Sequence, residues 1–194
     1  MSENFEEVKK QLKKELDHNR YEHTIGVMYT AGCLAMAYGY DIDKAQLAGI
    51  LHDCAKCIPN DKKLKLCEKH SIPVSKVESE NPFLLHAKLG AHVARDAYGI
   101  TDVDILHAIK VHTTGEPDMN LLDKIIYIAD YIEPLRDKAR NLKEIRQLAF
   151  SDIDAALRMI LTDSVAYLND NKEAANIDPM TLETYYYYTG GRHE

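Results

Sequence analysis

The sequence predicts an all-α protein, a single domain over residues 1–194 built as a helical bundle of about nine helices. Three observations support this fold class. Apolar residues recur at helical spacing along most of the chain. No run alternates apolar and polar residues as a half-buried strand would, and no internal repeat or low-complexity linker interrupts the chain. A chain of 194 residues is also long enough to bury one substantial core.

Four helices are expected in the first part of the chain. Apolar spacing places them at about 5–16, 21–38, 41–57 and 60–70. Gly39 ends the second helix because glycine readily adopts the left-handed conformation of a helix C-terminus. Pro59 stops the third helix, and Asn60 can cap the fourth.

Residues 71–80 are expected to form a loop, and helices follow it to the end of the chain. Their predicted bounds are 81–99, 101–112, 121–132, 142–150 and 151–169, with a cap at 176–179 before a last helix that carries residues 185–188. Asn81 with Pro82 is a cap and first-turn pair, and Thr101 with Asp104 matches a capping box. The polar stretch 113–120 is expected to be a loop.

The charge distribution argues against nucleic acid as a partner. The formal net charge is −7, and the lysines are scattered among acidic residues. A protein that binds a duplex usually gathers its cations into a stripe or patch. A small anionic substrate would therefore need its own local cations or metals.

The sequence also predicts a cytoplasmic protein without a membrane partner. No apolar run reaches the roughly 18 to 20 residues of a membrane-spanning helix, and the first residues are too acidic and polar for a signal peptide. Four cysteines are present, and Cys54 and Cys57 form an isolated C-x-x-C. In a reducing compartment these residues are expected to be thiols that pack in the fold.

Six residues of metal-ligand type are the most informative feature of the chain. His52 and Asp53 are adjacent inside an expected helix, and the other four lie on separate segments: His23, His86, His112 and Asp130. Nitrogen and oxygen donors favour iron, manganese, zinc, cobalt or nickel over calcium. Six protein ligands are too many for one open catalytic metal, so two metals bridged by Asp53 are expected.

The remaining histidines are expected to be surface or hydrogen-bonded residues: His18, His70, His92, His107 and His193. Asp130 differs, because a carboxylate within an apolar helix is costly to bury unless it is paired or bound to metal. Lys56 can be a helix-end cation, but it lies three residues after Asp53 and so near the same face. Contact with a phosphate is the interpretation we favour for Lys56.

The order of these residues resembles the HD superfamily of metal-dependent phosphohydrolases, whose hallmark is a histidine, a His-Asp pair and a distant aspartate. Longer segments resemble its YqeK subgroup, the symmetrical diadenosine tetraphosphate hydrolases. These segments are 20–27, 51–56, 112–115, 122–134 and 178–186.

The resemblance implies an all-α HD domain with a dinuclear centre, usually of iron, that cleaves diadenosine tetraphosphate to two ADP through a hydroxide bound between the metals. By position, His23, His52, Asp53 and Asp130 would bind one metal. His86, His112 and Asp53 would bind the second. Asp53 and Lys56 are then the candidate catalytic residues.

Substrate contacts are predicted for several further residues. Lys56, Thr113 and Arg136 are candidates for binding the polyphosphate, although a helix-end hydroxyl and a solvated cation describe Thr113 and Arg136 equally well. Arg20, Tyr21 and the residues around His86 are expected to line the nucleotide pocket, and His23, His86 and Asp130 are further candidates for binding the substrate. The tyrosines at 185–188 could stack on adenine, but core or interface packing is the more common role of such a run.

The sequence leaves several alternatives open. The protein could be another HD-type phosphohydrolase, such as a nucleotidase or a phosphodiesterase. It could instead be a regulatory module that binds a nucleotide, or a bundle with purely structural metals. The set of six candidate ligands is complete, and it lies near Lys56 and the loop that follows His112. This combination favours an enzyme with an open site. The native metal, the preferred nucleotide and the oligomeric state, including a homodimer, are undetermined.

Overall fold

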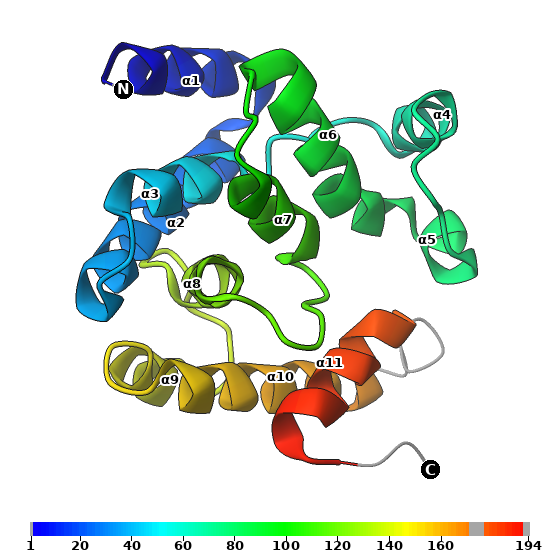
Figure 1. Ribbon diagram of the computed structural model, residues 1–194. Coiled ribbons are helices and arrows are strands. Elements are labelled where there is room, and N and C mark those ends of the chain that lie inside the picture. Colours follow the sequence, from blue (N-terminus) through cyan, green and yellow to red (C-terminus); the bar gives the residue numbers. More distant parts are fainter. Residues whose placement is uncertain (1, 171–176, 192–194) are drawn as a thin grey trace.

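The all-α prediction is confirmed. A computed structural model describes residues 2–170 and 177–191, and in these ranges it contains eleven α-helices, one 3-10 helix and no strand (Figure 1). The elements are α1 (Ser2–Glu15), α2 (His18–Tyr38), α3 (Ile42–Leu51), α4 (Asn60–Lys69), α5 (Lys76–Glu80), η1 (Pro82–Leu85), α6 (His86–Tyr98), α7 (Val103–Val111), α8 (Leu121–Ile132), α9 (Leu142–Leu148), α10 (Ile153–Asp170) and α11 (Pro179–Thr189).

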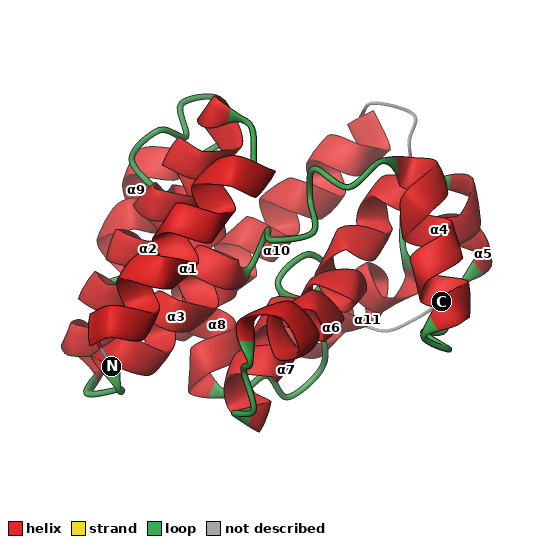
Figure 2. Cartoon of the chain, turned by 90° about the horizontal axis from the view of Figure 1, so that it is seen from above, coloured by secondary structure: helices red, strands yellow, loops and turns green. Residues whose placement is uncertain are grey.

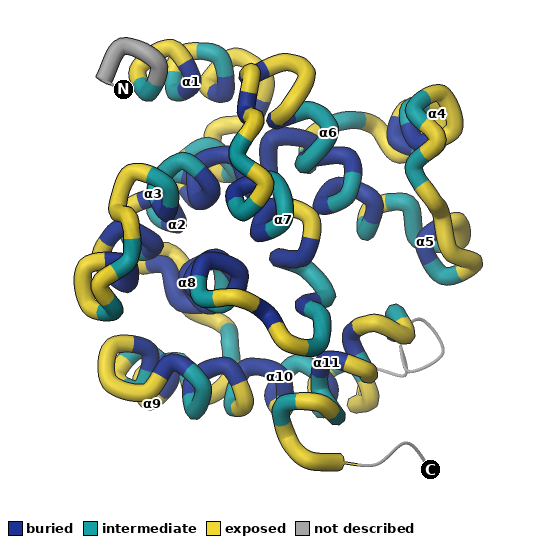
Figure 3. Tube along the Cα trace, viewed as in Figure 1, coloured by how far each residue is buried: buried dark blue, intermediate teal, exposed yellow. Residues whose placement is uncertain are grey.

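Helix α8 lies at the centre of the bundle, in contact with α2, α3, α7 and α10. Its apolar residues are almost all buried, and Figure 3 shows the helix surrounded by the other elements. The main core includes Leu34, Ile50, Ile109, Leu122 and Ile126, none of which is exposed to solvent. Burying one such side chain contributes about 1.5–3 kcal/mol, so this core fixes the relative positions of the helices that carry the site residues.

Helices α4 and α5 lie at one end of the molecule, far from α2 and α3 (Figures 1 and 2). They do not share the main core. A second, smaller cluster of Ala55, Cys67, Leu85 and Leu89 is packed beneath them. The attachment of this end therefore depends on few apolar contacts.

The third helix is shorter than expected, which corrects the placement of His52 and Asp53. Helix α3 ends at Leu51, His52 is its C-cap, and Asp53 lies in the turns that follow. Cys54 and Lys56 donate backbone hydrogen bonds to residues three positions earlier. Apolar spacing did not reveal this ending, because the turn residues are themselves buried and bind groups on other elements.

Other boundaries also differ from the prediction. The loop expected at 71–80 contains α5, capped by a Ser75–Glu78 capping box. The helix expected at 81–99 is divided at His86 into η1 and α6. Helix α7 is capped by Asp102 and not by Thr101, and Asp178 caps α11. Asn176 and His193 lie outside the described residues.

All four cysteines are free thiols, as expected. Cys54 is buried and donates to the carbonyl of Gly90. Within the described part of the chain, no helix combines the length and apolar character that crossing a bilayer requires.

Candidate metal centre

The structure brings all six predicted ligands together. His23 lies on α2, His52 and His112 at the ends of α3 and α7, His86 at the start of α6, and Asp130 on α8. The His23 Nε2 to Asp130 Oδ1 distance is 3.0 Å, and His86 Nε2 lies 3.2 Å from Asp53 Oδ1. Five separate segments thus converge on one point.

Three of the histidines are oriented by the same local contact. The Nδ1 atoms of His52, His86 and His112 each lie 2.7 Å from the carbonyl oxygen three residues earlier, on Gly49, Phe83 and Ile109. Carbonyl groups at a helix end lack partners within the helix. Because a carbonyl only accepts, each Nδ1 must carry the proton, and each neutral ring has its lone pair on Nε2.

His23 is oriented differently, by a residue that the sequence analysis missed. Its Nδ1 lies 3.0 Å from Oε1 of Glu133, which is 1% exposed. The other Glu133 oxygen accepts the backbone N–H of Leu135 at 2.7 Å. The only sequence signal was a carboxylate between an apolar helix and Pro134.

Gly26 makes the contact between His23 and Glu133 sterically possible. A Cβ atom at Gly26 would lie 2.6 Å from Oε2 of Glu133, closer than real Cβ contacts allow. Glycine one turn after His23 therefore leaves space for the carboxylate.

The inward-facing atoms need a cation. His23 Nε2, His52 Nε2 and Asp53 Oδ1 are buried and have no hydrogen-bond partner among the residues that the structure describes. His86 Nε2 and His112 Nε2, both with lone pairs, lie 3.2 Å apart. Two nitrogens bound to one ion at about 2.1 Å are separated by about 3–3.5 Å. These residues fit divalent metal binding, and His23, His52 and Asp130 form one candidate group while His52, Asp53 and His112 form another.

Both aspartates are ionised near neutral pH. Burial alone would raise the pKa of Asp53, but its interactions with the imidazoles of His52, His112 and His86 hold that pKa well below its usual value. Burial of Asp130 is likewise outweighed by its interactions with the imidazoles of His23 and His52 and by the charge of Arg136. The pKa of this carboxyl is also well below its usual value.

His86 is kept neutral by its surroundings. Burial lowers the pKa of its ring from 6.5 to about 4, and the neighbouring charge of Lys56 acts in the same direction against the opposing effect of Asp53. Metal binding requires the neutral imidazole. The ring is therefore prepared as a ligand at neutral pH.

Cations border the centre on the side open to solvent. Arg20 Nη1 lies 2.7 Å from Asp53 Oδ2, and Arg136 Nη2 lies 2.8 Å from Asp130 Oδ1. Lys56 Nζ lies 3.1 Å from His86 Nε2, and burial lowers the pKa of its amine. The Thr113 hydroxyl oxygen lies 3.2 Å from the same nitrogen.

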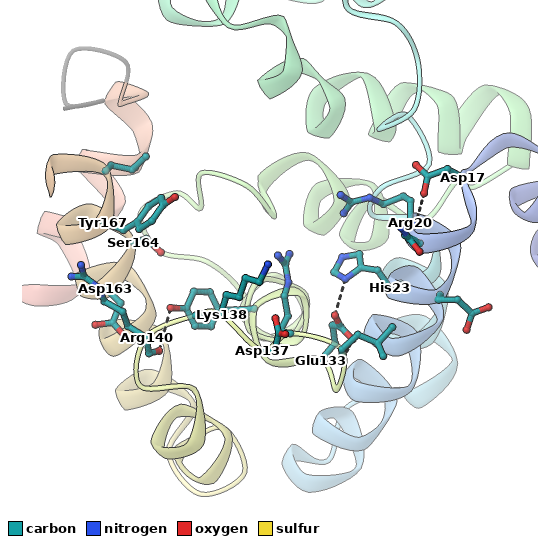
Figure 4. Close-up of a pocket in the computed structure, with 17 residues that line it drawn as sticks. Asp17, Arg20, His23, Glu133, Asp137, Lys138, Arg140, Asp163, Ser164 and Tyr167 are labelled. Atoms are coloured by element: carbon teal, nitrogen blue, oxygen red, sulfur yellow. Dashed lines mark hydrogen bonds and ion pairs between the residues drawn. The ribbon is translucent and has the colours of Figure 1, made fainter. Parts of the chain in front are cut away.

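Two neighbouring cavities border these groups. The smaller, of about 210 Å³, is lined by Lys56, His86, His112, Thr113, Tyr127, Asp130, Tyr131, Arg136, Ala139, Ile160 and Ser164. It shares Tyr131, Arg136, Ala139 and Ser164 with a cleft of about 1180 Å³. Arg20 and His23 lie on one side of this cleft, opposite Ser164 and Tyr167 of α10 (Figure 4). Lys138, Arg140 and Tyr167 are lining residues that the sequence analysis did not single out.

Tyr21 and the tyrosines at 185–188 are not among the residues that line the two cavities. Tyr21 packs against the main core with Lys13 near its ring, and it lines neither cavity. Among the tyrosines at 185–188, the Tyr188 hydroxyl accepts the backbone N–H of Met119, and Tyr187 donates to Asp118. These two contacts match the packing role and place this helix against the 113–120 loop.

Comparison with known proteins gives consistent matches along the chain. The sequence model of the HD domain family matches residues 20–135. A symmetrical bis(5'-nucleosyl)-tetraphosphatase of Bacillus subtilis is 39% identical over 188 residues, which are 97% of this chain and 99% of that protein. The protein of the same name from Halalkalibacterium halodurans is 41% identical over 174 residues, 90% of this chain and 91% of that protein.

One solved structure is also similar to this chain over nearly the whole length of both proteins. It is the crystal structure of a predicted HD superfamily hydrolase involved in NAD metabolism from Clostridium acetobutylicum. The TM-score is 0.91 at 38% sequence identity, with 96% of this chain and 97% of that chain covered.

Proposed function

Because the chain belongs to the HD domain family and its relatives of nearly equal length are symmetrical bis(5'-nucleosyl)-tetraphosphatases, we propose that it hydrolyses diadenosine tetraphosphate symmetrically to two ADP. The observation that carries the proposal is the complete set of six inward-facing ligands beside a cleft bordered by cations. A regulatory module that only binds nucleotide would not need every ligand of a hydrolytic centre. The four free cysteines agree with a cytoplasmic enzyme.

The proposed centre contains two metals bridged by Asp53. Oδ1 of Asp53 lies 3.2 Å from His86 Nε2 and 3.6 Å from His112 Nε2. Oδ2 lies 3.4 Å from His52 Nε2 and 3.9 Å from His23 Nε2. Because its two oxygens face different pairs of imidazoles, Asp53 can contribute to both sites. His23, His52, Asp53 and Asp130 bind one metal, and His86, His112 and Asp53 bind the other.

Iron is the metal proposed for both sites, and manganese, cobalt, nickel and zinc suit the same nitrogen and oxygen donors. When bound, such ions lower the pKa of a water molecule and neutralise phosphate oxygens. The chain itself orients the reacting groups. The backbone carbonyls and Glu133 hold the imidazole rings with Nε2 inward.

The substrate is positioned by the cationic and hydroxyl groups at the rim. Lys56 and Thr113 line the smaller cavity and can donate to the phosphates nearest the metals. Arg136 lines both cavities and can bind the chain of phosphates where it passes between them. The large cleft, with Arg20, Lys138 and Arg140, has room for one nucleoside end. These local cations compensate for the net negative charge of the protein.

Product analysis tests the proposal. Diadenosine tetraphosphate is incubated with purified protein and iron or manganese, with and without chelator, and the products are separated by chromatography. ADP as the sole product, abolished by chelation and restored by metal, is the expected result. ATP with AMP would contradict symmetrical cleavage. No turnover would favour another HD-type phosphohydrolase, tested next with mononucleotides and cyclic nucleotides, or a binding module.

A further inference from the structure

A second group of metal-ligand side chains lies outside the candidate centre. His70 is the C-cap of α4, and His92 and Asp96 lie one turn apart on α6. Each offers one ligand atom, and these atoms lie within 4.8 Å of one another. The His70 and His92 ring centroids are only 3.9 Å apart. His92 is six residues after His86, about 9 Å farther along α6, so the two groups share no ligand.

The polar contacts of His92 leave one ring nitrogen unsatisfied. Arg95 Nη2 donates to His92 Nδ1 at 2.8 Å, and because a guanidinium only donates, Nδ1 is the acceptor. His92 Nε2 is buried and makes no hydrogen bond within the described ranges 2–170 and 177–191, although it lies 3.0 Å from Asp96 Oδ2. A buried polar atom in this state is costly unless it has a further partner.

We propose that His70, His92 and Asp96 form a separate binding site for one divalent cation of the zinc or nickel class. Two imidazoles and one carboxylate suit such borderline metals and leave one coordination position for water. Asp96 is about half exposed, with 49% of its side chain accessible, so a cation can enter from solvent. The site is structural and has no role in the hydrolysis.

The position of this site determines what metal binding does. His70 and His92 come from α4 and α6, and α4 packs on a small apolar cluster separate from the main core. A cation between them links the end of α4 directly to α6. Because it binds only the folded chain, it raises the free energy of unfolding in proportion to the logarithm of its concentration.

Arg95 competes with the proposed cation for His92 and Asp96. Its Nε also lies 2.8 Å from Asp96 Oδ1, so the guanidinium contacts two of the three ligands. A metal can bind Nε2 of His92 only after the ring proton has moved from Nε2 to Nδ1. Nδ1 is the atom that now accepts a hydrogen bond from Arg95. Removing Arg95 should therefore tighten binding, whereas removing a ligand should weaken it.

Calorimetric titration with zinc tests the site on protein whose candidate metal centre is already filled. We expect one additional zinc per chain in the wild type. His92→Ala and His70→Ala should weaken this binding by about tenfold or more, and Arg95→Ala should strengthen it severalfold. His18→Ala, which removes an exposed histidine outside the group, should leave it unchanged. Histidine ring ¹⁵N spectra of the wild type should show two perturbed imidazoles.

Each variant is first compared with the wild type by circular dichroism and by thermal unfolding without added zinc. No additional zinc at millimolar concentration would overturn the proposal, as would equal affinity in His92→Ala and His18→Ala. Because the readout is binding and not turnover, the result is independent of the proposed hydrolysis.

Discussion

Asp53 is the residue on which the proposed centre depends. Its two oxygens face different imidazole pairs, and Arg20 bonds one of them. Lys56 differs, because its amine lies 3.9 Å from the Asp53 carboxylate and lines the cavity. One residue is thus placed to bind metal and the other to bind substrate.

Asp53→Ala should therefore abolish activity and remove most bound metal, whereas Lys56→Ala should keep its metal and lose about 10–100-fold in turnover. Metal analysis after dialysis, together with initial rates, separates the two effects. An active Asp53→Ala protein with a full metal complement would refute the bridging assignment.

Gly26 and Gly32, both on α2, provide a matched test of the Glu133 contact. A Cβ atom at Gly26 would meet Glu133 Oε2 at 2.6 Å, and one at Gly32 would meet the flexible Gln46 side chain at 2.8 Å. Both alanine variants gain the same helix propensity, about 1 kcal/mol. We expect Gly26→Ala to lower metal affinity about 10–100-fold by displacing the partner of His23.

The Gly32→Ala control should retain the wild-type metal affinity, because Gln46 can rotate away. Affinity is measured by competition with a metal indicator. If the two variants bind metal equally well, Glu133 has no part in orienting His23.

Helix ends, and not helix faces, orient three of the four histidines in the candidate centre. Three histidines occupy caps or first positions and use the unpaired carbonyls found there. The segment after α8 is arranged by Arg146 of α9. Its guanidinium donates to the carbonyl oxygens of Ile132, Glu133 and Arg136 at 2.8–2.9 Å. One side chain thus positions both the partner of His23 and a substrate-binding candidate.

The Arg146→Met substitution should release this segment, because three carbonyl groups lose a charged hydrogen-bond donor. We expect kcat/KM to fall about tenfold and the free energy of unfolding to fall by about 2 kcal/mol. Steady-state kinetics and urea unfolding measure the two effects. Arg158→Met, at an exposed position of α10, is the control and should change neither quantity. Equal behaviour of the two variants would show that Arg146 does not position the segment.

At the scale of the whole molecule, the centre joins α2, α3, α6, α7 and α8, so its protonation affects global stability. Burial lowers the pKa of His86 from 6.5 to about 4 in the metal-free fold. Between these values the unfolded chain binds a proton that the folded chain does not. The free energy of unfolding must therefore fall as the pH falls from about 6.5 to about 4.

Urea unfolding of chelator-treated protein at about pH 7 and about pH 5 should show this loss. His86→Asn removes the titrating ring and should flatten the dependence, while His18→Asn should keep it. An unchanged slope in His86→Asn would exclude His86 as its source.

The sequence determined most of the helices and the chemical types of the candidate ligands. Helical periodicity is a local property, and a chain with few carboxylates within apolar helices offers few choices for the acidic ligands of a metal site. The sequence predicted six candidate ligands together with Arg20, Lys56, Thr113 and Arg136, and the structure brings these ten side chains close to one another.

The tertiary structure decided what depends on contacts between distant segments. His23 and Glu133 are 110 residues apart, and only packing of α2 against α8 brings them together. Tertiary contacts likewise decide where α3 ends, that Tyr21 packs against the main core and that α10 contributes residues to the cleft. Periodicity specifies which face of a helix is apolar, but the neighbour that covers this face is selected by the free energy of packing the whole chain.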